Sequence, residues 1–228
     1  VLPRADKTLL TLRELVVTPV DRMRDLLRVV HETSRSTLAR HLAGTLKDVV
    51  PETFSGIYQN ATGDTAWLSN PAYAWLVSGD TFRTEELPRG KLTVVLQVPH
   101  KALEVTPAVA RVVVGSLLNA MFEADGRVAG RVLFAIDEAV LLGREPALLT
   151  ALTQGRKYRL SLHLYYQDDG QVERIWDRHG KRTWFNNLAW RAYAAVQDVD
   201  TAKEVSAACG EHAVETLAKG RNSGWQAK

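Results

Sequence analysis

The feature that most limits the fold is a regular alternation of short apolar runs with helix-length segments in the second half of the chain. Four apolar runs of strand length lie at 92–98, 131–136, 160–166 and 188–196. Strands that alternate with helices in this way are typical of βαβ units, in which successive strands run parallel. We therefore predict an α/β domain with a parallel sheet over residues 88–228.

The segments between these runs carry helix signals. We expect helices at about 105–124, 146–158, 170–180 and 201–210. Pro146 opens one of them, in the first turn that proline tolerates. Thr201 and Glu204 have capping-box spacing at the start of the last, and Gly210 is a terminator at its end.

The first 87 residues follow a different period. Apolar side chains recur at three- and four-residue steps, as in Met23, Leu26, Leu27 and Val30, and no β-branched run resembles a strand. Asp6 is the expected N-cap of the first helix. Residues 1–87 are therefore predicted to form an all-α domain.

Composition excludes several classes of site. The chain has 29 basic and 26 acidic residues, a net charge of +3, so only mild attraction to polyanions is expected. Cys209 is the single cysteine, which excludes an intrachain disulfide and a cysteine-based zinc site. No stretch resembles a signal peptide or a membrane span. Since residue 1 is Val, we expect the sequence to begin within a longer protein.

Two acids stand at the end of an apolar strand. Asp137 and Glu138 follow 131–136, and Gln167 follows 160–166. Because ligands of parallel sheets bind beyond the carboxyl ends of the strands, these three residues are candidates for a nucleotide site. The alternative is that the strand simply ends at the surface and both acids are solvated.

At these residues the sequence resembles the type IV coupling proteins of conjugation and type IV secretion. VLFAIDEAVLLGR (132–144) is similar to their Walker B strand and the turn after it, and LTQGRKYRLSLHLYYQD (152–168) is similar to the segment that follows. DKTLLTLRELVVTP (6–19) and AWLSNPAYAWLVSGDTFRTEELPRGKLTVVLQVP (66–99) resemble the edges of the all-α domain inserted in their motor domain.

The resemblance implies roles for individual residues. Coupling proteins are hexameric P-loop ATPases at the cytoplasmic face of the bacterial inner membrane, and they use ATP and Mg²⁺. Asp137 would bind the water shell of Mg²⁺, Glu138 would orient the attacking water, and Gln167 would sense the γ-phosphate. Arg156 resembles the family's arginine finger, which reaches a neighbouring subunit's nucleotide. The alternatives are a solvated helix end for Arg156 and a turn cap for Gln167.

One part of the motor is missing from the sequence. No G-x-x-x-x-G-K-[ST] phosphate loop occurs in the 228 residues. In the family, this loop and the membrane anchor precede the all-α insert, so both are expected before Val1. The predicted fold class is thus a partial RecA-like P-loop ATPase sheet, the Walker B half, preceded by an all-α inserted domain. The chain alone is expected to bind no nucleotide or Mg²⁺ and to hydrolyse ATP negligibly.

In the family, the all-α domain chooses the substrate, either a relaxase–DNA complex or a secreted effector protein. The candidate partner-binding residues here are Arg24, Arg28, Arg35 and Arg40. Such a basic set could contact the phosphates of single-stranded DNA with salt-sensitive affinity. The alternative is a solvated face in which acidic residues are interleaved.

Two other functions stay open on the sequence alone. The chain could be a non-catalytic adaptor that binds a partner protein through its helical half, or it could belong to a different DNA translocase or helicase. A phosphate loop and transmembrane helices upstream would favour the coupling ATPase. The resemblance implies that such an ATPase also binds other components of the secretion system.

Overall fold

The computed structural model describes residues 8–79 and 81–211. These fall into two compact units, one ending at Asn187 and the other beginning at Leu188.

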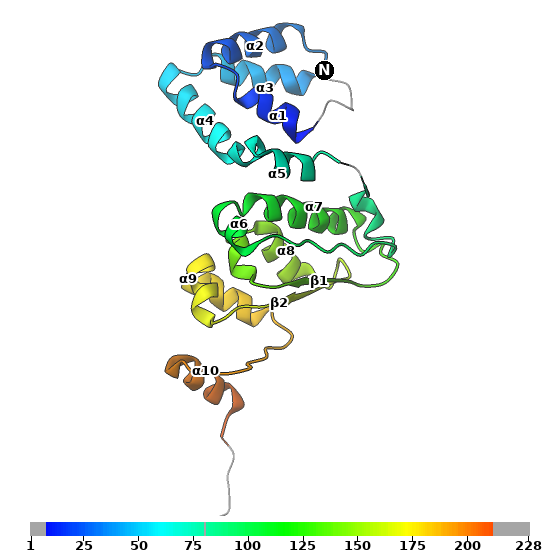
Figure 1. Ribbon diagram of the computed structural model, residues 1–228, viewed down its shortest axis with the longest axis vertical. Helices are drawn as coiled ribbons and strands as arrows, with labels where there is room; N and C mark the ends of the chain where they lie inside the picture. The colour runs from blue at the N-terminus through cyan, green and yellow to red at the C-terminus, as the bar shows by residue number, and fades with distance from the viewer. Residues whose placement is uncertain (1–7, 80, 212–228) are drawn as a thin grey trace, which may run out of the picture. The chain divides into compact units, whose positions relative to one another are not determined.

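The first part of the larger unit is helical. Residues 8–79 form helices without any strand, as the three- and four-residue spacing predicts (Figure 1). The helices are α1 (Leu9–Val16), α2 (Val20–Thr33), α3 (Thr37–Lys47), α4 (Pro51–Asp64), the 3₁₀ turn η2 (Ala66–Ser69) and α5 (Pro71–Leu76).

Polar contacts fix these helices to one another. Thr8 caps α1 by accepting from the N–H of Thr11 at 3.1 Å, so the cap is Thr8, while Asp6 lies outside the described residues. Arg13 on α1 donates to the carbonyl of Thr62 at 2.7 Å and to Ser69 Oγ at 3.0 Å. α1 is thereby held against α4 and η2.

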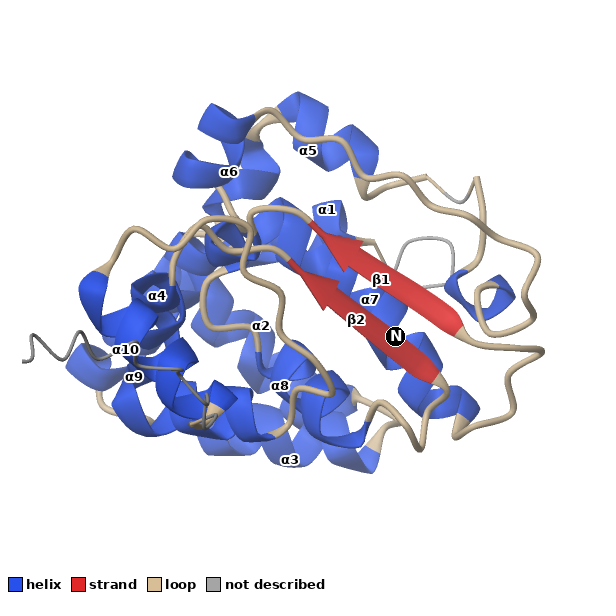
Figure 2. Ribbon diagram, turned by 90° about the horizontal axis from the view of Figure 1, so that it is seen from below, coloured by secondary structure: helices blue, strands red, loops and turns tan. Residues whose placement is uncertain are grey.

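The rest of the unit is an α/β structure. After η3 (Thr84–Glu86) come α6 (His100–Val105), α7 (Ala108–Ala124), β1 (Val132–Ile136), η4 (Ala139–Leu142), α8 (Pro146–Gln154), β2 (Leu160–Leu164) and α9 (Asp169–Asn186). β1 and β2 pair in parallel, with Val132 opposite Leu160 and Ile136 opposite Leu164 (Figure 2). The predicted βαβ unit is confirmed for this pair of strands.

Helices cover one face of the two strands. Leu118 and Met121 of α7 are fully buried, as is Leu148 of α8. Burial alternates along β1, so Phe134 packs against this core while Leu133 on the other face is 54% exposed. A two-residue period with one covered face is the pattern of a half-buried strand.

The strand predicted at 92–98 is not formed. The segment has no regular secondary structure, although Leu92, Val94 and Leu96 pack against the core. Val95, between two of these positions, is 85% exposed. The β-rich apolar run that suggested a strand is thus packed on one side only, and the segment forms no ladder with the described sheet, which has two strands.

The strand predicted at 188–196 is also wrong. These residues are irregular, and those from Ala189 onward are exposed. The apolar run that suggested a strand is therefore largely exposed and forms no described strand.

The helix of the second unit is α10 (Val199–Cys209). Asp198 caps it by accepting from the N–H of Thr201 at 2.7 Å. The expected capping box at Thr201 is therefore wrong, whereas Gly210 does end the helix.

Several helix boundaries differ from the prediction. The helix expected at 105–124 is α7, which begins at Ala108; α6 is an additional short helix before it, and α8 ends at Gln154. α9 is longer than expected and breaks at Asp177, whose φ of 61° and ψ of 179° are not helical. No helix in the described residues is long and apolar enough to cross a membrane.

Candidate nucleotide-binding edge

The parallel pairing brings three of the four predicted catalytic residues to one edge of the sheet. Asp137 and Glu138 directly follow β1, and Gln167 lies three residues after the end of β2. Because Ile136 is opposite Leu164 and the strands run in the same direction, both carboxyl ends meet at that edge. This is the edge at which parallel α/β sheets bind ligands.

Backbone contacts hold the turn after β1. The N–H of Glu138 donates to Asp137 Oδ1 at 2.9 Å, and the N–H of Ala139 donates to the carbonyl of Tyr165 at 3.1 Å. Glu138 itself has left-handed geometry, with φ 45° and ψ 49°. Such a conformation costs a non-glycine residue on the order of 1 kcal/mol, and strained residues of this kind concentrate at functional sites.

The two acids are at the surface. Asp137 is exposed and the Glu138 side chain is 36% exposed, so neither carboxylate is buried without a partner. Both interpretations of the pair, a nucleotide site and a solvated strand end, predict exposed acids, because a nucleotide site must be open until its ligand binds.

His100, which the sequence analysis did not single out, contacts the site. It is the first residue of α6, and its Nε2 lies 2.9 Å from Glu138 Oε2. The other ring nitrogen, Nδ1, lies 3.6 Å from Glu104 Oε1. No motif in the sequence signals this contact, because it depends on how α6 packs against η4, the turn that follows β1.

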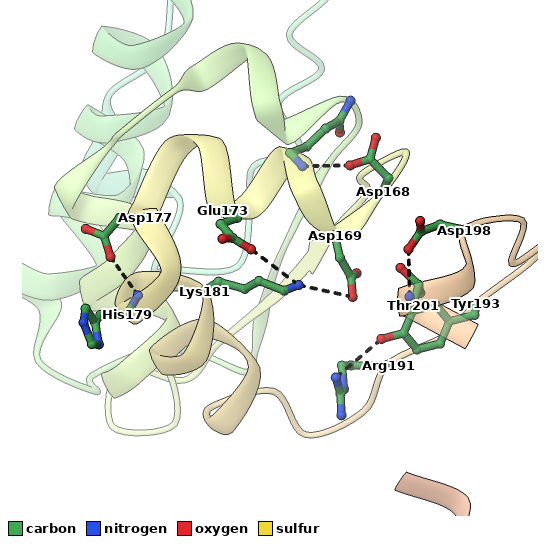
Figure 3. A network of polar contacts seen from close by, with 11 residues as sticks. Asp168, Asp169, Glu173, Asp177, His179, Lys181, Arg191, Tyr193, Asp198 and Thr201 are labelled. Carbon is green, nitrogen blue, oxygen red and sulfur yellow. Dashed lines mark hydrogen bonds and ion pairs between the residues drawn. The ribbon is translucent and has the colours of Figure 1, made fainter. Parts of the chain in front are cut away.

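The turn that carries Gln167 is anchored by a second glutamine. Gln171, which is buried, accepts from the N–H of Gln167 through Oε1 at 3.0 Å. Asp168 caps α9 by accepting from the N–H of Gln171 at 2.9 Å (Figure 3). Gln167 is thus fixed through its backbone, and its side chain is exposed at the edge. No motif in the sequence points to Gln171.

α9 is held across its break by charged groups. Lys181 lies 3.9 Å from both Asp169 and Glu173, between the two parts of the helix (Figure 3). Asp177 at the break accepts from the N–H groups of Gly180 and His179, and these bonds, with that of Gly180 foremost, lower the pKa of its carboxyl. The break is therefore a capped start for the second part of α9.

Arg156 does not join the other three residues. It follows α8 and precedes β2, so it lies at the amino end of that strand, where it is exposed. Within one chain, the predicted finger and the paired acids therefore occupy opposite edges of the sheet.

Of the four predicted partner-binding arginines, Arg24 is occupied within the fold. Its guanidinium donates to the carbonyl of Val49 and lies 4.9 Å from the centre of the Phe54 ring. Arg28 pairs with Asp25 at 2.8 Å on the surface of α2. Arg35 and Arg40 are exposed. The four residues thus divide into one packed side chain and three at the surface.

The acids at the edge fit a magnesium–nucleotide site better than a protein-only metal centre. No group of three or more His, Cys, Asp or Glu side chains in the described ranges could hold a metal ion. Mg²⁺ that travels with a nucleotide needs only one or two carboxylates, because phosphates and waters supply the remaining ligands. The exposed Asp137 satisfies that requirement.

Comparison with known proteins shows which family the chain resembles. The family described as "Type IV secretory system Conjugative DNA transfer" matches residues 11–225. The chain is 39% identical over 220 residues to the type IV secretion system-coupling protein VirD4 of Bartonella quintana. It is 40% identical over 220 residues to the conjugal transfer protein TraG of Agrobacterium fabrum. No solved structure matches the chain.

The chain belongs to the family of type IV secretion coupling proteins. Each of these two alignments covers 96% of the chain, so the family resemblance inferred from the Walker B-like run is confirmed along nearly its whole length. The chain spans about a third of the length of these relatives, 34% for VirD4 and 33% for TraG.

Proposed function

We propose that this chain supplies the Walker B side of the nucleotide site in an ATP-driven coupling protein. The observation that supports the proposal most directly is the shared carboxyl edge of β1 and β2, which bears Asp137, Glu138 and Gln167. An acid pair and an amide at one open edge are the groups that a P-loop motor places around the γ-phosphate.

The proposed chemistry assigns one task to each side chain. Asp137 would hold Mg²⁺ through its water shell, and Glu138 would orient and polarise the water that attacks the γ-phosphate. Gln167 would donate its amide N–H to a γ-phosphate oxygen. The bound Mg²⁺ and ATP would supply charge neutralisation and the phosphoryl group. A phosphate loop would have to come from residues outside this sequence.

The relatives support the wider role. Their names describe a type IV secretion coupling protein and a conjugal transfer protein. We extend this to a homo-hexamer at the cytoplasmic face of the inner membrane that works with other secretion components. Its helical part, residues 1–87, would recruit a relaxase–DNA complex or an effector protein, and ATP hydrolysis would drive transfer.

The test is ATP turnover by the full-length product of the gene. We expect Glu138→Gln to lower kcat by roughly 100-fold or more while ATP binding is retained, because the amide cannot polarise the water. Glu123→Gln, which changes an exposed acid on α7, is the matched control and should keep wild-type turnover. A full-length wild-type protein without ATPase activity would contradict the proposal.

The 228-residue chain gives a second arm. Without a phosphate loop it should show no turnover above the Glu138→Gln background. If this chain hydrolyses ATP and Glu138→Gln abolishes that activity, then residues within the chain bind the phosphates. Partner capture by the chain together with an inactive full-length protein would instead favour the adaptor function.

A further inference from the structure

His100, which contacts Glu138, is not among the predicted site residues. His100 Nε2 lies 2.9 Å from Glu138 Oε2, and this approach ties the start of α6 to the carboxylate. We propose that His100 is a positioning residue that holds the Glu138 carboxylate for its role in orienting the attacking water. This inference rests on the proposed function, since it concerns how Glu138 is aimed.

The backbone of Glu138 is already fixed, but its side chain is not. Its N–H donates to Asp137 Oδ1, and its carbonyl accepts from the N–H of Leu141 at 2.9 Å. The carboxylate itself extends from that turn on a flexible side chain and is 36% exposed. A freely rotating carboxylate would spend only part of its time beside the attacking water.

His100 supplies a restraint on that side chain. The imidazole begins α6, and α6 packs against η4, the 3₁₀ turn that directly follows Glu138. The ring therefore approaches the carboxylate from an element that is itself anchored to the same turn. Glu104, one helical turn further along α6, lies 3.6 Å from Nδ1, so Glu138 is the nearer of the two carboxylates to the imidazole.

The contact with His100 leaves one carboxylate oxygen of Glu138 available to the attacking water. With Oε2 held by the imidazole, Oε1 is the oxygen that can accept a hydrogen bond from the attacking water. Productive positions of catalytic groups must be kept within about 0.5 Å, and misplacement by about 1 Å can lower the rate about 100-fold. The restraint acts on the position of the carboxylate and needs no contact between His100 and nucleotide.

Kinetics of the full-length protein test the role. His100→Ala is expected to lower kcat about tenfold with an unchanged KM for ATP, because positioning affects the reacting water and not nucleotide binding. His100→Gln keeps an N–H donor at similar reach and should recover kcat to within about threefold of wild type. Lys101→Ala, at the next and exposed position of α6, is the matched control.

The contact itself can be observed in the 228-residue chain without nucleotide. In nitrogen-15 NMR of the histidine rings, Glu138→Gln should shift the ring-nitrogen signals of His100 and leave those of His179 in place. Circular dichroism of each variant checks that the fold is retained.

The outcomes separate the two proposals. An active wild-type protein whose His100→Ala variant keeps wild-type kcat, or whose His100→Gln variant is as slow as His100→Ala, overturns the positioning role and leaves the proposed function intact. Unchanged His100 signals in Glu138→Gln overturn it as well. An inactive wild-type protein with the predicted NMR shift would instead count against the ATPase.

Discussion

Arg111 on α7 lies against Gly143, the residue that ends the turn after the acid pair. Its guanidinium donates to the carbonyl of Leu142, and Gly143 has a φ of 62° and a ψ of −150°, which is a region used almost only by glycine. A Cβ at position 143 would collide with Arg111 Nη2. The positive φ, together with the nearby Arg111 side chain, therefore favours a residue without a side chain at this position.

Gly143→Ala should destabilise the protein. The new Cβ meets both the positive φ and the Arg111 side chain, so we expect a loss of about 1–3 kcal/mol in the free energy of unfolding. Urea denaturation measures it. Gly130→Ala, at a position with open space around it, should change stability by less than about 1 kcal/mol in either direction. Equal losses for both variants would show that the turn is not constrained as described.

Leu118→Ala should remove a central part of the core. Leu118 is fully buried, and truncating such a residue costs about 2–5 kcal/mol through lost burial and the cavity that remains. Leu133→Ala, on the uncovered face of β1, should cost less than about 1 kcal/mol. Denaturant midpoints of the two variants give the comparison, and a larger loss at Leu133 would mean that this face is covered in solution.

Tyr166 should make stability fall at high pH. Burial raises the pKa of its phenol to about 12, because the anion is poorly solvated there. The folded pKa lies above the unfolded value of about 10, so the stabilisation is complete below about pH 10 and is lost as pH rises toward 12. Two pKa units correspond to roughly 2–3 kcal/mol. Ultraviolet titration of wild type against Tyr166→Phe locates the transition, and a phenol that titrates near its ordinary pKa contradicts it.

Arg24→Ala should act on stability. The guanidinium donates to Val49 and stacks on Phe54, so its removal should cost about 1–3 kcal/mol. Thermal unfolding measures the loss. Arg28→Ala is the matched control, because its exposed pair with Asp25 is worth little. An Arg24→Ala variant as stable as wild type would return Arg24 to the set available for partners.

Arg35→Ala and Arg40→Ala should weaken binding of single-stranded DNA without affecting stability. Both side chains are exposed, and each lost phosphate contact should reduce the salt dependence of log K by about 0.7. Fluorescence anisotropy across a salt series tests this. Wild-type affinity that does not change with salt would move the expected partner of the helical part from DNA to protein.

The parts of the fold that depend on local signals could be predicted from the sequence. The helical first half and the strands β1 and β2 follow from side-chain spacing, and the carboxyl-edge position of Asp137, Glu138 and Gln167 follows from parallel pairing. The strand predicted at 92–98 failed for a different reason. A short β-rich apolar run indicates burial, but it does not indicate whether a neighbouring strand is present to complete the ladder.

Contacts between residues that are distant in the chain could not be predicted from the sequence. The 2.9 Å approach of His100 to Glu138 joins residues far apart in the chain, and Gln171 serves Gln167 through a buried amide that has no motif. In the sequence, Arg24 cannot be distinguished from the neighbouring arginines, because all carry the same charge. Only the structure shows that it packs on Phe54.

The place of Arg156 at the amino end of β2 has a consequence for mixed assemblies. If a ring forms and Arg156 is the arginine finger that the family resemblance implies, a neighbour's arginine would complete each nucleotide site, so two subunits would share every active centre. Doping wild-type protein with Arg156→Ala copies would then disable sites whose own acids are intact, and Glu138→Gln copies would still lend their arginine to a wild-type neighbour. Two mutants that are each inactive alone would restore some turnover when combined.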